Sequence, residues 1–204
     1  MTSRRDFLAA STVATASFFD RTKFEAVLNV PYRHRQVFGF GHIKAGMGLA
    51  QMRNSLNAYE FGYGVGPGTL HVAGVFYGTA VPLGLDDAAW RKYRLAEASK
   101  RRADAVTDPR AVDRNPFAND DGVARTDDST IAGLAKRGAS FFMCNHALTG
   151  MATFLTVGDG LVPGSLDAVL ADLRALLLPQ VMLVPAGVAA LNDAQEARYT
   201  YLAT

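Results

Sequence analysis

Short apolar runs alternate with amphipathic helical segments along most of this chain, and that alternation constrains the fold more than any single residue does. The clearest example is the stretch 165–184. Its leucines and valines fall on one stripe of a helix, Pro179 ends that helix, and the apolar residues 181–184 follow as a short strand. Residues 35–59 and 70–99 show the same alternation, each as a strand followed by a helix. Such strands, apolar on both faces, predict a parallel sheet with helices on both sides and right-handed crossovers.

Two segments of the C-terminal half of the chain carry further predictions. A turn at residues 185–187 precedes a predicted last helix from about Val188 to Leu202. Between Lys100 and Thr130, thirteen of thirty-one residues are charged and no apolar period is visible. This composition predicts a long solvated insertion, which leaves open a lid, an oligomer arm or a plain loop.

The first twenty residues have the features of a targeting segment. Arg4 and Arg5 precede Phe7 and a weakly apolar stretch that ends at Ala16, as in a twin-arginine export signal. The alternative is an ordinary basic start with a chance pair of arginines. We expect residues 1–20 to be a signal segment, residues 21–204 to form one α/β domain, and the mature protein to be periplasmic or otherwise exported.

Composition excludes several classes of function. The formal net charge is +2, and removal of Arg4, Arg5 and Asp6 takes away two positive charges and one negative charge, which leaves +1. A chain so close to neutral lacks the electrostatic surface expected of a nucleic-acid-binding protein. No other segment has the apolar length of a membrane helix, so we expect no membrane span in the mature chain.

The single cysteine, Cys144, is the main candidate for chemistry. It follows the apolar run 139–143 and precedes Asn145, His146 and a helical stretch, so it is expected at the carboxyl end of a strand, facing a helix N-terminus. The unpaired N–H groups of a helix N-terminus favour the thiolate over the thiol. Asn145 could orient the loop or cap the helix, and His146 could act as a base. The alternative for Cys144 is an inert thiol packed in the core.

Other motifs fit less well. Gly39 and Gly41 open a helix as a dinucleotide-binding fingerprint does, but the third glycine comes at Gly46 instead of position 44. The glycine-rich stretch 62–68 lacks the lysine of a phosphate-binding loop, and no Gly-x-Ser-x-Gly elbow is present. We therefore predict no cofactor and no dedicated metal site.

One metal alternative stays open. Cys144, His146 and His42 could form a composite site, because parallel strands bring their carboxyl ends together. His42 could also reach Cys144 as a base from the end of the first strand.

At this point three short motifs carry a family resemblance. Residues 141–145, the turn 184–188 and the stretch 195–202 resemble the small DsrE-like proteins of the DsrE/DsrF sulfur-relay superfamily. The resemblance implies a flavodoxin-like three-layer α/β sandwich with a mainly parallel sheet of about five strands. It also implies homo- or hetero-oligomers and a cysteine, here Cys144, able to carry sulfane sulfur. The segment 100–130 and the export signal are departures from that family.

Two functions from different classes follow. The first is an exported DsrE-like protein that holds sulfane sulfur as a persulfide on Cys144, with Asn145 and His146 as accessory residues. It would take sulfur from a small donor and pass it to a partner thiol. The second is a non-catalytic, oligomeric binding or assembly module whose contact surface is supplied by aromatic side chains. Its candidate aromatic residues are Phe61, Tyr63, Phe76, Tyr77, Trp90 and Tyr93.

Overall fold

The structure is a computed structural model that describes residues 18–119, 129–158 and 161–204. Most of the predicted signal segment, residues 1–17, lies outside the described residues, as do residues 120–128 of the predicted insertion. Among the described residues, no helix is both long and apolar enough to cross a membrane.

A five-stranded sheet forms the centre of the domain. Its strands lie in the order β4-β3-β2-β1-β5, and every neighbouring pair is parallel. The strands are β1 (His34–Phe40), β2 (Leu70–Phe76), β3 (Ser140–Cys144), β4 (Val181–Val184) and β5 (Thr200–Ala203). The predicted α/β class with a parallel sheet of about five strands is confirmed.

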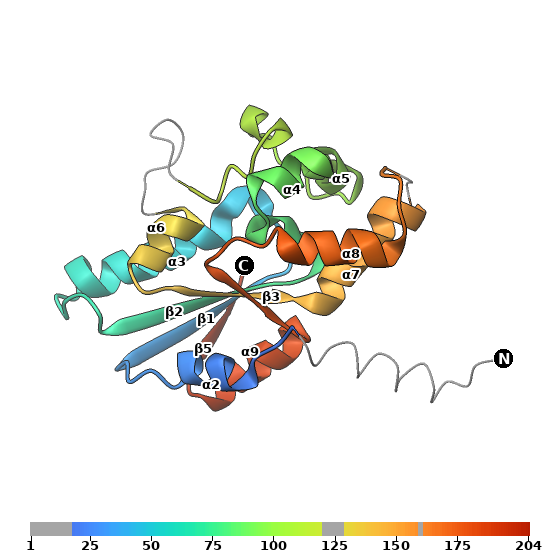
Figure 1. Cartoon of the computed structure of the whole chain (residues 1–204). Helices are drawn as coiled ribbons and strands as arrows, with labels where there is room; N and C mark the ends of the chain where they lie inside the picture. Colours follow the sequence, from blue (N-terminus) through green and yellow to red (C-terminus); the bar gives the residue numbers. More distant parts are fainter. Residues whose placement is uncertain (1–17, 120–128, 159–160) are drawn as a thin grey trace.

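Helices cover both faces of this sheet, which gives three layers (Figure 1). One side carries α3 (Met47–Asn57), α4 (Asp87–Lys92), α5 (Leu95–Arg101), α6 (Ile131–Lys136), α7 (Asn145–Thr153) and α8 (Leu166–Ala175). The other side carries α2 (Arg21–Leu28) and α9 (Gly187–Glu196). The arrangement is consistent with a flavodoxin-like sandwich.

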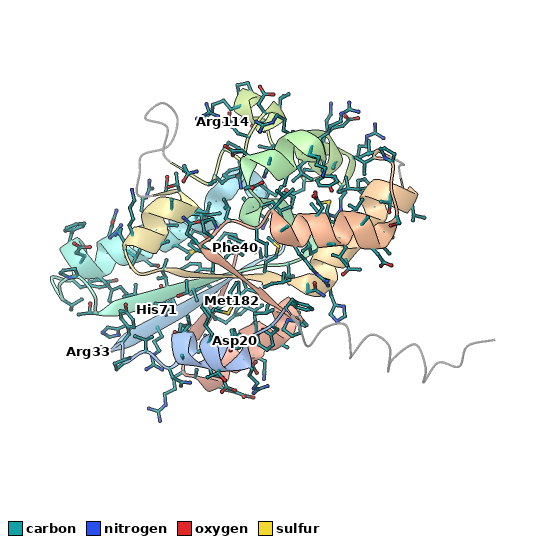
Figure 2. The ribbon with its side chains drawn as sticks, in the orientation of Figure 1. Asp20, Arg33, Phe40, His71, Arg114 and Met182 are labelled. Atoms are coloured by element: carbon teal, nitrogen blue, oxygen red, sulfur yellow. The ribbon has the colours of Figure 1, made fainter. Side chains whose placement is uncertain are left out.

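Each face of the sheet has its own core. The larger one contains Phe40, Phe76 and Phe141 together with the buried side chains of α3, α7 and α8. The smaller one contains Val75 and Phe142 under α2 and α9, with Met182 packed against it. Phe40 and Met182 are labelled on the two sides of the sheet in Figure 2. Because both faces are covered, all seven residues of β2 are buried, which explains why six of them are apolar or glycine and His71 is the one polar side chain.

Helix α8 forms as its sequence predicts. Ser165 is the N-cap, and its Oγ accepts a hydrogen bond from the backbone N–H of Ala168 at 3.3 Å. The helix ends at Ala175, before Pro179, and buries Val169 and Leu173. The cap and the proline are local signals, so sequence alone was sufficient here.

The predicted helix from Val188 to Leu202 is wrong in its second half. Helix α9 ends at Glu196, Arg198 takes a left-handed conformation with a φ of 68°, and Thr200–Ala203 form strand β5. Pairing with β1 supplies the backbone hydrogen bonds of this segment. That partner lies far away in the sequence, so no local pattern could announce it.

The described part of the predicted solvated insertion is solvated only in part: residues such as Val112 and Asp113 are exposed, whereas others pack into the core. Asp104, Ala111, Asn115 and Phe117 are all buried. The Asn115 side-chain amide donates to the carbonyl oxygens of Leu83 and Leu85, both at 2.7 Å. Hydrogen bonds of this kind let a polar, charged stretch pack against the core without an apolar period.

Two of the predicted helices are shorter than expected. The predicted helix starting near Asp86 divides into α4 and α5 at Arg94, whose φ is 50°. The helix expected from Lys44 begins at Met47, because Lys44 and Ala45 both have positive φ angles, of 42° and 52°.

Candidate functional site

The carboxyl ends of β3 and β4 are the point at which the chain changes sides. After β3 it enters α7, whose buried residues belong to the larger core, whereas after β4 it enters α9, which packs in the smaller core. In open parallel sheets this divergence is where ligands bind, outside the carboxyl ends of the strands. Cys144 is the last residue of β3, and its partner in register is Val184 of β4.

Cys144 is held at the N-terminus of α7. It is the N-cap residue, and the backbone N–H of Ala147 donates to its Sγ at 3.3 Å. Cys144, and not Asn145, is therefore the cap of α7, and the prediction that Asn145 could cap this helix is wrong. A sulfur that accepts a hydrogen bond at a helix N-terminus is better able to carry negative charge.

Helix α9 covers the same cysteine from the other face of the sheet. A Cβ built on Gly187 would lie 3.1 Å from the Cβ of Cys144 and 2.9 Å from the Cβ of Tyr77. Glycine at position 187 therefore lets α9 approach the strand ends closely. The result is that Cys144 is only 7% exposed.

Asn145 is buried and hydrogen-bonded to Arg174, a residue that was not predicted to belong to the site. The Oδ1 of Asn145 accepts two hydrogen bonds from Arg174 of α8, from Nε at 3.1 Å and from Nη2 at 2.8 Å. The Arg174 guanidinium also lies over the ring of Phe18, 4.7 Å from its centroid. Asn145 thus fixes the start of α7 against α8. Nothing local in the sequence pairs residues 145 and 174, although an arginine in the last turn of an amphipathic helix is a common way to reach a neighbour.

His146 and His42 do not assemble with Cys144. His146 is exposed, and no hydrogen bond joins it to Cys144 among the described residues. His42 follows β1, two strands from β3, which is a separation of roughly 10 Å. Its Nδ1 instead lies 2.9 Å from the Oγ1 of Thr79 and 3.8 Å from the Oδ2 of Asp104.

The composite metal site of Cys144, His146 and His42 is accordingly not formed. In the part of the chain that the structure describes, no group of three or more His, Cys, Asp or Glu side chains could hold a metal ion.

Asp104 is a second residue that sequence reasoning missed. Its buried carboxylate accepts the backbone N–H groups of Ile43 at 2.6 Å and Lys44 at 3.2 Å, together with the hydroxyl of Thr79. These bonds hold the turn after β1, in which Lys44 has a positive φ, against the residues that follow β2. The carboxylate satisfies backbone donors that the strained turn would otherwise leave unpaired.

Tyr77 lies near Cys144, because the Cβ atoms of both residues face Gly187. The ring of Tyr77 lies against Gly41, and Tyr201 of β5 hydrogen-bonds to it. Burial raises the pKa of Tyr77, and the hydrogen bond between its hydroxyl and Tyr201 adds to that effect. The Tyr77 hydroxyl is therefore neutral at physiological pH and can donate or accept hydrogen bonds.

The other aromatic candidates divide between surface and core. Phe61 and Tyr63 are 72% and 70% exposed, whereas Phe76, Trp90 and Tyr93 are buried. Only the first two can therefore contribute to a contact surface without a change in the fold.

The fold and the site together define a class of protein: a doubly wound parallel α/β domain with a cysteine that caps a helix at the topological switch point. No family model and no curated protein matches the chain. Among solved structures it is similar to a protein of unknown function, MTH1491, from Methanobacterium thermoautotrophicum. The identity is 14% and the TM-score is 0.45, over 84% of this chain and 99% of that one.

Proposed function

We propose that this protein is an exported DsrE-like sulfur carrier that holds sulfane sulfur as a persulfide on Cys144. The observation that carries the proposal is the hydrogen bond from the Ala147 N–H to Sγ at the N-terminus of α7. A persulfide anion is a charged sulfur species, and a helix N-terminus stabilises negative charge. The position at the switch point of the sheet supports the same reading.

The transfer needs no external oxidant. The Cys144 thiolate attacks the outer sulfur of a donor persulfide, a new S–S bond forms, and the donor leaves as its own thiolate. In the second step an acceptor thiolate attacks the outer sulfur on Cys144, the S–S bond to Cys144 breaks, and the Cys144 thiolate is regenerated. Asn145 is then a positioning residue, since its bonds with Arg174 fix the turn that aims the Ala147 N–H at sulfur.

One observation favours a second function, that of a non-catalytic binding or assembly module. Cys144 is 7% exposed and lies under α9, and a thiol covered in this way reacts slowly with large reagents. In this alternative the cysteine is a packing residue and the exposed aromatic residues Phe61 and Tyr63 contact a partner, such as a second copy of the chain.

Intact mass spectrometry separates the two functions. The protein is isolated without reductant, treated with a donor persulfide, and compared with Cys144→Ser. A reducible gain of about 32 Da, one sulfur atom, in the wild type alone supports the carrier. A wild type that never gains sulfur and labels with a maleimide only after unfolding overturns it and leaves the binding module.

Export is part of the proposal and has its own test. Replacement of Arg4 and Arg5 by lysine is expected to keep the protein in the cytoplasm, because the twin-arginine route requires that pair. Cell fractionation of the double variant and the wild type measures this, and equal periplasmic amounts would contradict it.

Homo-oligomers are likewise proposed, and light scattering after gel filtration would show them.

A further inference from the structure

A cavity of about 430 Å³ lies between α4 and α8, outside the segments that surround Cys144. The end of α4, the loop that precedes α8 and one face of α8 contribute to its wall. The volume is at the lower end of the range for ligand pockets, roughly 300–1,000 Å³, which suits a small molecule. The loop contributes Val162 and Pro163, and α8 contributes Ala168 and Val169. This part of the lining is apolar.

The polar side chains of the lining are Lys92, Tyr93 and Asp172, and the first two both hydrogen-bond to the carboxylate of Asp172. The hydroxyl of Tyr93 donates to the Oδ2 of Asp172 at 2.6 Å, and the Nζ of Lys92 donates to the same oxygen at 3.0 Å. Hydrogen bonds from Tyr93 and Lys92 lower the pKa of Asp172, and burial raises the pKa of Tyr93. Asp172 is therefore ionised and Tyr93 neutral at pH 7.

Hydrogen-bonding capacity is left over at this carboxylate. Both bonds go to Oδ2, so the Oδ1 of Asp172 has no hydrogen-bond partner among the described residues. The Lys92 ammonium carries three donors and uses one of them on Asp172. The cavity thus offers an anionic acceptor and a cationic donor beside an apolar lining.

Charge complementarity restricts the ligand. A simple carboxylate could pair with Lys92 but would be repelled by Asp172, and a simple amine would pair with Asp172 but be repelled by Lys92. A molecule that carries an ammonium and a carboxylate on the same carbon atom meets both requirements. We propose that this cavity binds a free α-amino acid with an aliphatic side chain, its ammonium on Asp172, its carboxylate on Lys92 and its side chain against Val162, Pro163 and Val169.

Calorimetric titration of the purified protein with three probes tests the proposal. L-leucine carries both charges, isocaproate lacks the ammonium, and isoamylamine lacks the carboxylate. We expect leucine to bind about tenfold more tightly than either analogue, the ratio expected when one charged partner is lost in a partly exposed site. Equal affinity for leucine and isocaproate, or no binding of leucine at millimolar concentration, overturns the proposal.

Variants then assign the binding to this cavity. Asp172→Asn is expected to weaken leucine binding by about tenfold, because the charge that faces the ligand ammonium is removed. The matched control is Asp167→Asn, which makes the same change on an exposed residue of α8 outside the cavity and leaves affinity unchanged. Ala168→Trp fills the cavity from an exposed position on α8 and should abolish binding while the melting temperature stays at the wild-type value. Leucine binding that survives Ala168→Trp overturns the assignment.

Discussion

Acid should destabilise this protein through one buried histidine, His71 of β2. His71 is 3% exposed, with Nδ1 lying 2.6 Å from the hydroxyl of Tyr199 and Nε2 lying 3.0 Å from the Oγ of Ser140. Its ring also stacks on Tyr32 at a centroid distance of 4.9 Å. Burial lowers the pKa of His71 from 6.5 to about 4, and the nearby charge of Arg35 acts in the same direction. Figure 2 labels His71 toward the end of the sheet opposite Cys144.

The size of the effect follows from proton linkage. The pKa of His71 is lower in the folded chain than in the unfolded one, so the unfolded chain binds more protons between pH 6.5 and pH 4. Stability therefore falls as the pH falls through this window. At 1.36 kcal/mol per pKa unit, the loss from this residue is about 2 kcal/mol at pH 5 and about 3 kcal/mol once the folded-state group titrates.

Urea unfolding measures this loss. Trp90 is the single tryptophan and is fully buried, so its fluorescence reports unfolding at pH 7.5 and at pH 5. From pH 7.5 to pH 5, the free energy of unfolding should fall by about 2 kcal/mol more in the wild type than in His71→Gln, because glutamine does not titrate. The variant will be less stable at both values, since Tyr199 and Ser140 lose a partner, but only the difference between the conditions matters.

A matched control uses His146, which is exposed. His146→Gln should keep the pH dependence of the wild type. Equal losses in the wild type and in His71→Gln would refute the argument that burial keeps His71 neutral.

The remaining predictions concern backbone and packing, and each is measured by urea unfolding. Gly187→Ala should lower the free energy of unfolding by about 1–3 kcal/mol, because its Cβ would overlap Tyr77 and Cys144. Gly150→Ala, in the open interior of α7, should instead raise it by about 0.5–1 kcal/mol. A loss of stability at both positions would contradict the packing argument. Arg198→Gly should raise the free energy of unfolding by about 1 kcal/mol, because glycine adopts the left-handed conformation at this position without strain. An unchanged urea midpoint would contradict strain at residue 198. Asp104→Ala should lose about 1–3 kcal/mol and speed exchange of the Ile43 amide, and protection equal to wild type would show that this amide needs no carboxylate.

Much of the fold was predictable because its signals are local. The strand 181–184 and the helix before it follow from an apolar stripe, a serine cap and a proline, all within twenty residues. Strand β5 was missed because its partner β1 is remote in the sequence, and the buried segment around Asn115 was missed because hydrogen bonds replace an apolar pattern there. Residues whose structure depends on distant partners leave little trace in a local pattern.

The site was predictable to the same extent. The position of Cys144 at a strand end before a helix follows from the residues on either side of it. The surroundings of Cys144 do not follow from the local sequence. Arg174 reaches Asn145 from another helix, and Gly187 approaches Cys144 from the opposite face of the sheet. The chemistry of an α/β site is assembled from several strand ends, so one sequence identifies its central residue more readily than its neighbours.

The position of β5 has a consequence for the growing chain on the ribosome. Gln36 of β1 pairs with Thr200, so one edge of β1 has no partner until nearly the whole described domain has been synthesised. At about 5–20 residues per second this delay is on the order of ten to thirty seconds. During that time the nascent sheet presents a strand edge with unpaired backbone N–H and C=O groups, of the kind that pairs with other chains. Pairing of another chain with this edge before β5 is made would lower the yield of folded protein without any change in the stability of the finished core.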